Sequence, residues 1–548
     1  MLTSSPPRPV RLTPSLPAGF SELRPQQEDA LRAILETDKK FIIIQAPTGS
    51  GKSLIAAMAQ RLLNVKALYS PHTKQLQRQF VTDFPSSVEL RGRSNYPTTR
   101  FARHFPRIHA GLCTSGKEPH CRWCCDGHCG AGEGQKCKAP CAYKEQKQRA
   151  LRANLAVINN AFFLNEANYV GSFSGWPLVV FDEADLLESI LLGFSELSFT
   201  AKWIERLRLE PPERKTVQSS WLLWAQEQVL STIERELRLL QTTIEDIRRE
   251  EELTRMKRKV EFFLESTQAG QKWAFTATKS SWTFKPGYVS AFAPLYLWRH
   301  ADRFLLMSAT IISLDEMSAT LRIPKEDIEF IDLPSTFPAA NRSILYWPTA
   351  NITKATEATE RPKAIAALDE VLAVMPPVKT LVHTVSYDYT QQVLKESRFK
   401  GRMVSYSGSQ QRESVLAAFK ASPKPLILVA ASMSRGVDLP EDECRLIVLM
   451  KTPFANLGDK QVSLRLYSDK KGGRLWYNVN AIREVVQMTG RGVRSDSDRC
   501  LSVIVDSQFG RLYEENRFLF PAWWSEALTT VKSRQHLETL VKRWQEAA

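Results

Sequence analysis

Features that mark exported or membrane-inserted proteins are missing from this sequence of 548 residues. It has no run of 18 apolar residues, and residues 1–17 are rich in proline without the apolar core of a signal peptide. We therefore expect neither export nor membrane insertion, and a cytoplasmic location. The composition, with 43% hydrophobic, 9% aromatic and 24% charged residues, excludes a fully disordered chain, a collagen-like chain and a small disulfide scaffold.

Cysteine is scarce outside one short interval. Seven of the nine cysteines lie between Cys113 and Cys141, and the other two, Cys444 and Cys500, are isolated. In a reducing compartment such a cluster indicates metal ligation more than disulfide bonds. Clusters of His or Asp that would indicate a nuclease are not evident outside the motifs described below, so we expect no cutting activity.

Acidic residues are outnumbered by basic ones. Lys and Arg total 74 against 59 Asp and Glu, a formal net charge of +15, which suits a polyanionic partner but is also common among ordinary basic proteins. More than half of this excess lies in residues 91–152, which have 13 Lys or Arg and four acids. The interval either contacts a phosphate backbone or is a solvated face. Its aromatic residues Phe101, Phe105 and Trp123 either stack on bases or form a small core.

Short apolar runs alternate with helix-like segments in both halves of the chain. Their β-branched composition is typical of buried parallel strands. The predicted strands are residues 40–45, 67–69, 177–181 and 304–307, and then 379–383, 426–430, 446–450 and 501–505. Because the pattern repeats beyond Asn341, and because the length predicts several domains, we expect two α/β domains, one of which has two insertions.

One of these insertions is predicted to be helical. Its apolar positions, at spacings of 4, 4, 3, 4 and 3, form one stripe of a helix; they are Val229, Ile233, Leu237, Leu240, Ile244 and Ile247. The stripe predicts a helix that packs either on its own domain's core or against a partner as a coiled coil.

Residues 46–53 read APTGSGKS, a phosphate-binding loop with alanine at the first glycine position. The loop lies between a predicted strand and a predicted helix, which is the context that such a loop requires. Lys52 would reach the β- and γ-phosphates, and the Ser53 hydroxyl would bind Mg²⁺. The nucleotide-binding residues expected from the loop are Ala46, Pro47, Thr48, Gly49, Ser50, Gly51, Lys52 and Ser53.

Two further motifs carry charge suited to phosphoryl transfer. Asp182 and Glu183 follow the third predicted strand, where Asp182 would hold Mg²⁺ and Glu183 would orient and deprotonate the attacking water. Residues 487–494 read QMTGRGVR, in which Arg491 and Arg494 can share one helix face and neutralise charge on the transferred phosphate. An acid-rich helix start and an exposed basic face are the structural alternatives.

Together these motifs resemble superfamily 2 helicases, specifically the XPD/DinG-like group, along nearly the whole chain. The matching segments, in the family's order, are RPQQ at 24–27, APTGSGKS at 46–53, YSPHTKQLQRQF at 69–80, DEAD at 182–185, MSAT at 307–310, LVHTVSY at 381–387, MSRGVDLP at 433–440 and QMTGRGVR at 487–494. The resemblance implies an α/β fold of two RecA-like P-loop domains, with ATP and Mg²⁺ bound between them. It also makes Gln487, with Lys52 and the two arginines, part of the catalytic set.

The resemblance assigns further positions to nucleotide and strand contacts. Gln27 would read adenine, and Asp438, beside Gly436, would link the second domain to ATP. Other implied roles are backbone contact by Thr73 and Lys74, coupling of hydrolysis to motion by Ser308 and Thr310, and a grip on the strand by His383 and Thr384. As structural alternatives, Thr310 caps a helix and His383 is a core histidine. The group usually has DEAH, whereas this chain has Asp185, which leaves RNA open as an alternative substrate.

In XPD-like helicases an insertion between the third and fourth of these segments, here between residues 80 and 182, holds a [4Fe-4S] cluster on four cysteines. Here GRSNY at 92–96 resembles its entrance, and Cys141, before Ala142 and Tyr143, resembles its exit. The candidate ligands are Cys113, Cys121, Cys124, Cys137 and Cys141, with Cys125 and Cys129 as competitors. Zn²⁺ is the alternative metal, because the C-x-x-C pair with His120 and His128 also fits tetrahedral ligation.

The resulting prediction is an ATP-dependent DNA helicase that translocates 5′-to-3′ on single-stranded DNA and unwinds duplex junctions. The expected divisions are residues 1–90, 151–193 and 288–340 for the first RecA-like domain, 91–150 for the Cys-rich insert, 194–287 for a helical arch-like insert and 341–548 for the second RecA-like domain. The alternatives are a nucleic-acid-stimulated ATPase or translocase without unwinding, an RNA-directed helicase, and a metal- or redox-responsive nucleic-acid-binding protein. Protein partners are not identified by the sequence.

Overall fold

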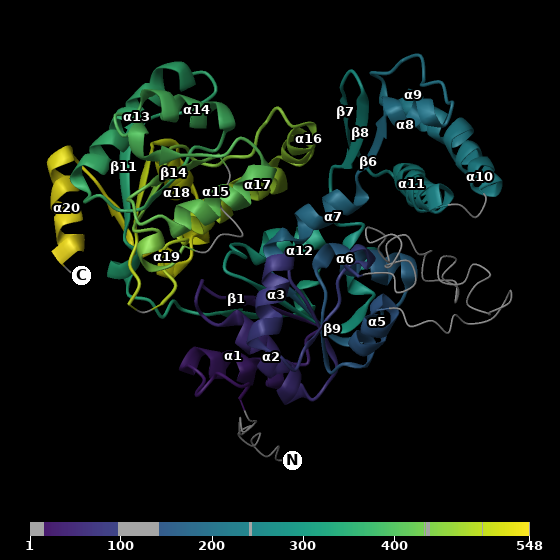
Figure 1. The fold of residues 1–548 in the computed structure, drawn as a ribbon, viewed down its shortest axis with the longest axis horizontal. Helices are drawn as coiled ribbons and strands as arrows, with labels where there is room; N and C mark the ends of the chain where they lie inside the picture. The colour runs from purple at the N-terminus through teal and green to yellow at the C-terminus, as the bar shows by residue number, and fades with distance from the viewer. Residues whose placement is uncertain are drawn as a thin grey trace, which may run out of the picture.

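A computed structural model of the protein describes residues 16–96, 142–240, 244–431, 433, 439–495 and 497–546. Asp438 and the seven clustered cysteines lie outside these residues. In the described part of the chain the fold consists of two lobes, each built on a seven-stranded parallel sheet, and an insertion that includes a three-stranded antiparallel sheet. Figure 1 shows the first lobe below the second, with the insertion beside the second lobe.

The first lobe has the strand order β10-β1-β9-β5-β2-β4-β3. All neighbouring strands are parallel, so their carboxyl ends meet at one edge, where ligands bind in such sheets. The strands are β1 Phe41–Gln45, β2 Ala67–Ser70, β3 Val88–Glu89, β4 Leu155–Val157, β5 Trp176–Asp182, β9 Ala301–Ser308 and β10 Ile328–Asp332. The helices are α1 Pro25–Glu36, α2 Lys52–Leu63, α3 Lys74–Asp83, α5 Ala142–Arg152, α6 Asn160–Asn165 and α12 Leu314–Leu321.

The second lobe has the order β13-β14-β12-β15-β16-β11-β17, again with parallel neighbours. Its strands are β11 Ile344–Ala350, β12 Thr380–His383, β13 Met403–Val404, β14 Ile427–Ala430, β15 Leu446–Leu449, β16 Leu501–Asp506 and β17 Leu528–Thr530. Its helices are α13 Glu357–Val374, α14 Tyr387–Glu396, α15 Ser409–Ala421, α16 Lys460–Ser468, α17 Lys470–Thr489, α18 Gln508–Glu515, α19 Ala522–Ser525 and α20 Arg534–Glu546. The two parallel α/β lobes that the sequence predicts are therefore confirmed, as are the eight predicted strands.

The insertion separates β5 from β9 in the chain, although these strands are neighbours in the sheet. Its strands are β6 Leu197–Thr200, β7 Trp273–Ala277 and β8 Ser281–Pro286, and its helices are α8 Ala201–Arg206, α9 Gln218–Trp224, α10 Leu230–Leu239 and α11 Ile244–Gln268. Helix α7 Leu187–Ser195, which leads from β5 to the insertion, packs on the core of the first lobe through Leu187 and Leu191. The insertion has a hydrophobic core of its own, which includes Trp221, Ile233 and Phe284. The antiparallel sheet was not predicted, because its strands are only four to six residues long; β6 and β8 nevertheless alternate between apolar and polar residues.

The apolar stripe from Val229 to Ile247 does not form the single helix that its spacing predicts. α10 ends at Leu239, Leu240 has an extended backbone with φ −65° and ψ 132°, and α11 begins at Ile244. Ile233 from α10 and Phe263 from α11 are buried in the same core. Periodicity conceals the break because both helices turn apolar residues toward one core. The helices therefore pack within the insertion itself, as the first of the two interpretations expects.

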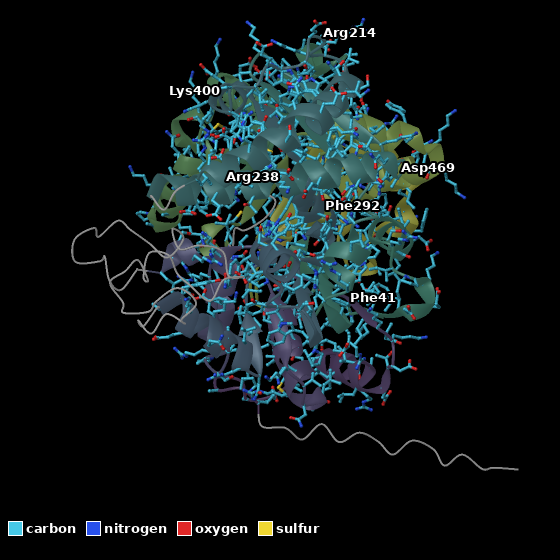
Figure 2. The ribbon with its side chains drawn as sticks, turned by 90° about the vertical axis from the view of Figure 1, so that its right-hand side faces the viewer. Phe41, Arg214, Arg238, Phe292, Lys400 and Asp469 are labelled. Carbon is cyan, nitrogen blue, oxygen red and sulfur yellow. The ribbon has the colours of Figure 1, made fainter. Side chains whose placement is uncertain are left out.

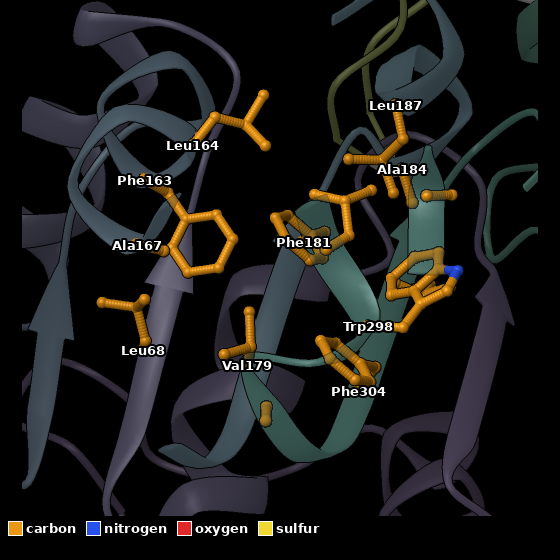
Figure 3. Close-up of a cluster of buried hydrophobic side chains, with 14 of the residues drawn as sticks. Leu68, Phe163, Leu164, Ala167, Val179, Phe181, Ala184, Leu187, Trp298 and Phe304 are labelled. Carbon is orange, nitrogen blue, oxygen red and sulfur yellow. The ribbon is translucent and has the colours of Figure 1, made fainter. Parts of the chain in front are cut away.

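An aromatic core supports the strands that end at the carboxyl edge of the first sheet. Phe181 lies between Phe163 and Phe304, with ring centroids at 5.5 and 6.4 Å, and Trp298 packs against Phe304 at 4.9 Å (Figure 3). Each such ring pair adds about 0.5–1.5 kcal/mol beyond the area that it buries. Because Phe181 directly precedes Asp182, this packing holds the end of β5 in place.

Charged side chains cover the outside of the molecule. Arg214, Lys400 and Asp469 are exposed, whereas Phe41 and Phe292 are buried (Figure 2). Among the described residues no helix is both long and apolar enough to cross a membrane.

Candidate active site

The loop between β1 and α2 is shaped by two glycines. Gly49 and Gly51 have φ values of +81° and +80°, in the left-handed region where other residues are strained. A Cβ at Gly51 would lie 2.2 Å from Nε2 of Gln27, and one at Gly49 would lie 2.3 Å from the Phe337 ring. Space and backbone conformation therefore both favour glycine, and the loop leads into the start of α2, the end of a helix that favours anions.

Side chains from α1 and α2 brace this loop. Gln27, which is buried, donates from Nε2 to the Ser50 carbonyl at 2.8 Å, and Arg24 donates to the Gly49 carbonyl at 2.9 Å. Lys52 Nζ donates to the Ala46 carbonyl at 3.2 Å. Gln27 thus contacts the backbone of the phosphate-binding loop, and its contact with adenine stays a prediction.

Asp182 ends β5 at the carboxyl edge of the sheet and is buried. Its Oδ2 accepts a hydrogen bond from the Tyr69 hydroxyl at 2.8 Å, and the Ser53 side chain interacts with the same hydroxyl. Burial, followed by the proximity of Asp182, raises the pKa of Tyr69 well above its usual value, so the phenol stays a neutral donor. Tyr69 therefore brings together Ser53 and Asp182, the two predicted Mg²⁺ ligands.

Glu183 follows in an unusual backbone conformation. Its φ is +54°, in the left-handed region that costs a non-glycine residue of order 1–3 kcal/mol and that occurs often at functional sites. Its amide donates to Asp182 Oδ1 at 3.1 Å. This turn places both consecutive carboxylates in the lining of one cleft.

Asp185 joins the acidic edge to the end of β9. Its Oδ1 accepts from the Ser308 hydroxyl at 2.6 Å, and its Oδ2 accepts from the Thr310 hydroxyl at 3.1 Å. Gln487 on α17 donates to Thr310 Oγ1 at 2.8 Å, and Arg491 donates to Gln487 Oε1 at 2.7 Å. A continuous hydrogen-bonded path therefore runs from the first sheet to the arginines of the second lobe.

The cleft between the lobes has a volume of about 330 Å³. Its lining places two carboxylates opposite cations from both lobes; the charged or hydroxyl-bearing lining residues that the sequence predicts are Lys52, Ser53, Thr73, Asp182, Glu183, Arg491 and Arg494. A carboxylate and a hydroxyl beside a lysine, with arginines opposite, form the set that in-line phosphoryl transfer with Mg²⁺ requires.

Other predicted residues are placed differently. Thr73 caps α3 by accepting from the Leu76 amide at 3.1 Å, and Lys74 is exposed beside it. His383 and Thr384 are buried, so they offer no surface to a strand in this conformation. Burial, followed by the charge of Arg491, lowers the pKa of His383 to about 3. Among the described residues no cluster of three or more His, Cys, Asp or Glu is suited to a metal ion.

Tyr69 is the functional residue that sequence reasoning missed. It stands in the segment at 69–80, but nothing in the sequence pairs it with Asp182. The contact arises from the register of β2 on β5, which places Tyr69 opposite Val180 and Ser70 opposite Phe181. The available signal was its position at the carboxyl end of a predicted strand.

Two family models match the chain. The "Helicase C-terminal domain" matches residues 368–527, and "Type III restriction enzyme, res subunit" matches residues 20–104. The ATP-dependent DNA helicase DinG of Photobacterium profundum is 25% identical over 231 residues, 38% of this chain and 32% of that protein. A Fanconi anemia group J protein homolog of Gallus gallus is 32% identical over 102 residues, 17% of this chain and 8% of that protein. The matches thus span less than a third of either relative.

Solved structures share the fold over nearly the whole chain. A structure titled "XPD_Helicase" has a TM-score of 0.62 at 16% identity, with 93% of this chain and 100% of that chain covered. The structure of S. tokodaii Xpd4 has a TM-score of 0.56 at 12% identity, with 92% and 99% covered. Family models, relatives and fold agree with the group that the sequence motifs indicate.

Proposed function

The chain resembles XPD/DinG-like superfamily 2 helicases, and from this premise we propose that it is an ATP-dependent DNA helicase that moves 5′-to-3′ on single-stranded DNA and unwinds duplex. The observation that carries the proposal is the path from Asp185 through Thr310 and Gln487 to Arg491. It links the acidic edge of one lobe to the arginines of the other. A change at the γ-phosphate would therefore alter the contact between the lobes, which is the movement that a translocating motor needs.

Each residue of the cleft has a chemical role in this proposal. Lys52 binds the β- and γ-phosphates, and Glu183 orients and deprotonates the attacking water. Ser53 and Asp182 offer the hard oxygen ligands that Mg²⁺ prefers, and bound Mg²⁺ would neutralise charge between the phosphates. Arg491 and Arg494 neutralise the charge that develops on the transferred phosphate, and Asp438 links the second lobe to ATP.

The strand is proposed to pass over the first lobe, between the Cys-rich interval and the insertion, which would serve as the arch. Thr73 and Lys74 contact its backbone, and the basic excess of residues 91–152 attracts its phosphates. We also propose the domain bounds given above for the two RecA-like domains, the Cys-rich insert and the arch. The protein is proposed to act in the reducing environment of the cytoplasm.

The two ends of the Cys-rich interval meet at one point. The rings of Tyr96 and Tyr143 are 5.6 Å apart, and the Arg93 guanidinium lies over Tyr143 at 5.4 Å. Tyr143 donates to Glu166 at 2.9 Å, and Lys147 pairs with the same carboxylate at 2.6 Å. The described residues on the two sides of the interval 97–141 therefore lie next to each other on the first lobe. This arrangement supports a module closed by a metal, with a [4Fe-4S] cluster proposed and Zn²⁺ as the alternative.

A forked DNA duplex with a 5′ single-stranded tail tests the helicase activity. We expect release of the labelled strand with ATP and Mg²⁺, and no release from a duplex that has only a 3′ tail. A fluorescent strand-displacement assay measures this release, and the ATPase rates with single-stranded DNA and with RNA are compared in parallel. ATP hydrolysis without strand release would instead support a translocase, and preferential stimulation by RNA would support an RNA-directed enzyme.

Anaerobic purification with metal analysis tests the cluster. We expect visible brown absorbance with iron and sulfide in equal amounts, and loss of both when Cys121 and Cys124 are replaced by serine, because a cluster needs its thiolate ligands. Cys444→Ala is the matched control, since this isolated cysteine is buried in the second lobe. A colourless protein with stoichiometric zinc would contradict the cluster, and a metal-free protein would contradict both metals.

A further inference from the structure

A buried polar network joins the lobes beside the cleft. We call it the inter-lobe latch, and it consists of Arg465, Trp476 and Arg483 from α16 and α17, and of Glu188, Glu316 and Thr320 from α7 and α12. The side chains of Arg483 and Glu316 are only 5% and 3% exposed, and those of Arg465 and Glu188 are 7% and 12% exposed. Charged side chains that are buried so deeply rarely form hydrogen bonds with water. Their contacts with one another therefore determine their positions.

Arg483 makes the principal contacts of the latch. Its guanidinium pairs with Glu316 at 2.7 Å and donates to the backbone carbonyls of Thr310 and Ile311, each at 3.2 Å. One side chain of α17 thus binds the backbone directly after β9. That backbone also carries the Thr310 hydroxyl that Gln487 and Asp185 contact.

The remaining contacts extend the latch to α7, which follows the DEAD segment. Thr320 donates to Glu316 at 2.6 Å and accepts from Arg465 at 2.6 Å. Arg465 lies 3.6 Å from a carboxylate oxygen of Glu188, and Trp476 Nε1 donates to the other oxygen at 2.8 Å. Two arginines of the second lobe therefore face two glutamates of the first, and the latch is electrically balanced.

A buried network of paired charges fixes the relative positions of the elements that it joins more than it raises the free energy of unfolding. Desolvation of paired charges offsets most of their attraction, whereas removal of one partner leaves a buried charge uncompensated. Burial raises the pKa of Glu188, and the charge of Arg465 opposes that rise. The latch is therefore sensitive to the loss of any one member.

The latch lies on the same face of α17 as Gln487. Arg483 and Gln487 are spaced four residues apart, so they share one face of the helix, and Arg491, which follows the end of α17 at Thr489, donates to Gln487 Oε1 at 2.7 Å. We infer that Arg483, held by Glu316 and by the carbonyls of residues 310 and 311, is a positioning residue that sets the rotation of α17 and so aims Gln487 and Arg491 at the nucleotide cleft. This inference rests on the proposed function, since it concerns the ATPase site of that motor.

The latch also contacts the segment after β8, by which the chain returns from the insertion to the first lobe. The Arg465 guanidinium lies over the Tyr288 ring at 4.4 Å, and Gln461 donates to the Gly287 carbonyl at 3.3 Å. A Cβ at Gly287 would lie 2.8 Å from Leu464. Movement of the insertion would therefore reach α16 directly, and through the latch it would reach Arg483 on α17 and, by way of Gln487, Arg491.

The test compares Arg483→Met, Glu316→Met and the double variant with the wild-type protein. In the single variants we expect kcat for ATP hydrolysis without nucleic acid to fall roughly 10- to 100-fold, because a small misplacement of a catalytic group is costly, while KM for ATP stays within about twofold. The thermal midpoint should fall in both single variants and recover in the double variant, which has no unpaired charge. The double variant should nevertheless keep the low kcat.

Arg474→Met is the matched control, because this arginine lies on the same helix, is exposed and pairs with Glu515 at 2.9 Å. If kcat recovered together with the thermal midpoint in the double variant, the inference would be overturned. The ion pair of Arg483 with Glu316 would then serve only the stability of the fold. Unchanged kcat in the folded single variants would overturn it too. Stimulation of the wild-type ATPase by nucleic acid tests the proposed function separately, and a wild-type protein without any ATP hydrolysis would refute both.

Discussion

Replacement of Lys52 by alanine is expected to lower ATP hydrolysis by at least roughly 10²- to 10³-fold, the effect of removing one preorganised donor from a developing charge. Lys52 begins α2 at the phosphate-binding loop, and its ammonium group is held at the Ala46 carbonyl, from which it would move to the phosphates. Binding of single-stranded DNA should stay within about threefold of wild type, because the proposed strand contacts are elsewhere. Phosphate release and fluorescence anisotropy of a labelled oligonucleotide measure the two effects.

Lys66→Ala is the matched control for this change, since Lys66 is exposed just beyond the same helix. It should hydrolyse ATP as the wild type does. Undiminished turnover in Lys52→Ala would refute the site assignment. A loss of hydrolysis in both lysine variants would show that the effect does not come from the phosphate-binding loop.

The largest effect is expected for Arg491→Ala, with hydrolysis roughly 10³-fold slower, as for removal of an arginine that acts on the transferred phosphate. Arg491 reaches the cleft from the second lobe and is oriented by Gln487 at 2.7 Å. Because the first lobe supplies the phosphate-binding loop, affinity for a fluorescent ATP analogue should change by only about threefold. Single-turnover hydrolysis and analogue titration separate the two quantities.

Arg511→Ala, an exposed arginine on α18, controls for the loss of a positive charge from the second lobe. It should keep the wild-type rate. If Arg491→Ala lost nucleotide affinity in proportion to its rate, Arg491 would be a binding residue and its proposed action on the transferred phosphate would be wrong.

Much of the fold could be predicted because parallel strands leave a strong local signal. Runs such as FIIIQ in β1 and WPLVVFD in β5 are almost wholly buried, and strands buried on both faces must be apolar throughout. The loop after β1 and the acids after β5 were predictable for a related reason. Chemistry at the carboxyl edge of a sheet requires particular residue types directly after a strand.

Contacts between distant segments could not be predicted in this way. The hydrogen bond from Tyr69 to Asp182 depends on strand register, and the pair of Arg483 with Glu316 joins different lobes. Local sequence patterns carry no information on which distant residues form these two contacts. The break at Leu240 was hidden because apolar spacing continues from α10 into α11. The residues that line the cleft were thus largely predictable from the sequence, whereas the contacts that link the lobes required the structure.

The position of β1 has a consequence for synthesis of the chain. Both of its sheet neighbours, β9 and β10, come from residues 301–332, after the whole insertion. A nascent chain that grows from its N-terminus can pair β2, β4 and β5 early, but it holds the apolar strand FIIIQ without a partner for more than 250 residues of translation. The strand that precedes the phosphate-binding loop is therefore among the last of the first lobe to find its sheet partners, and until then it exposes an apolar segment of the kind that promotes aggregation.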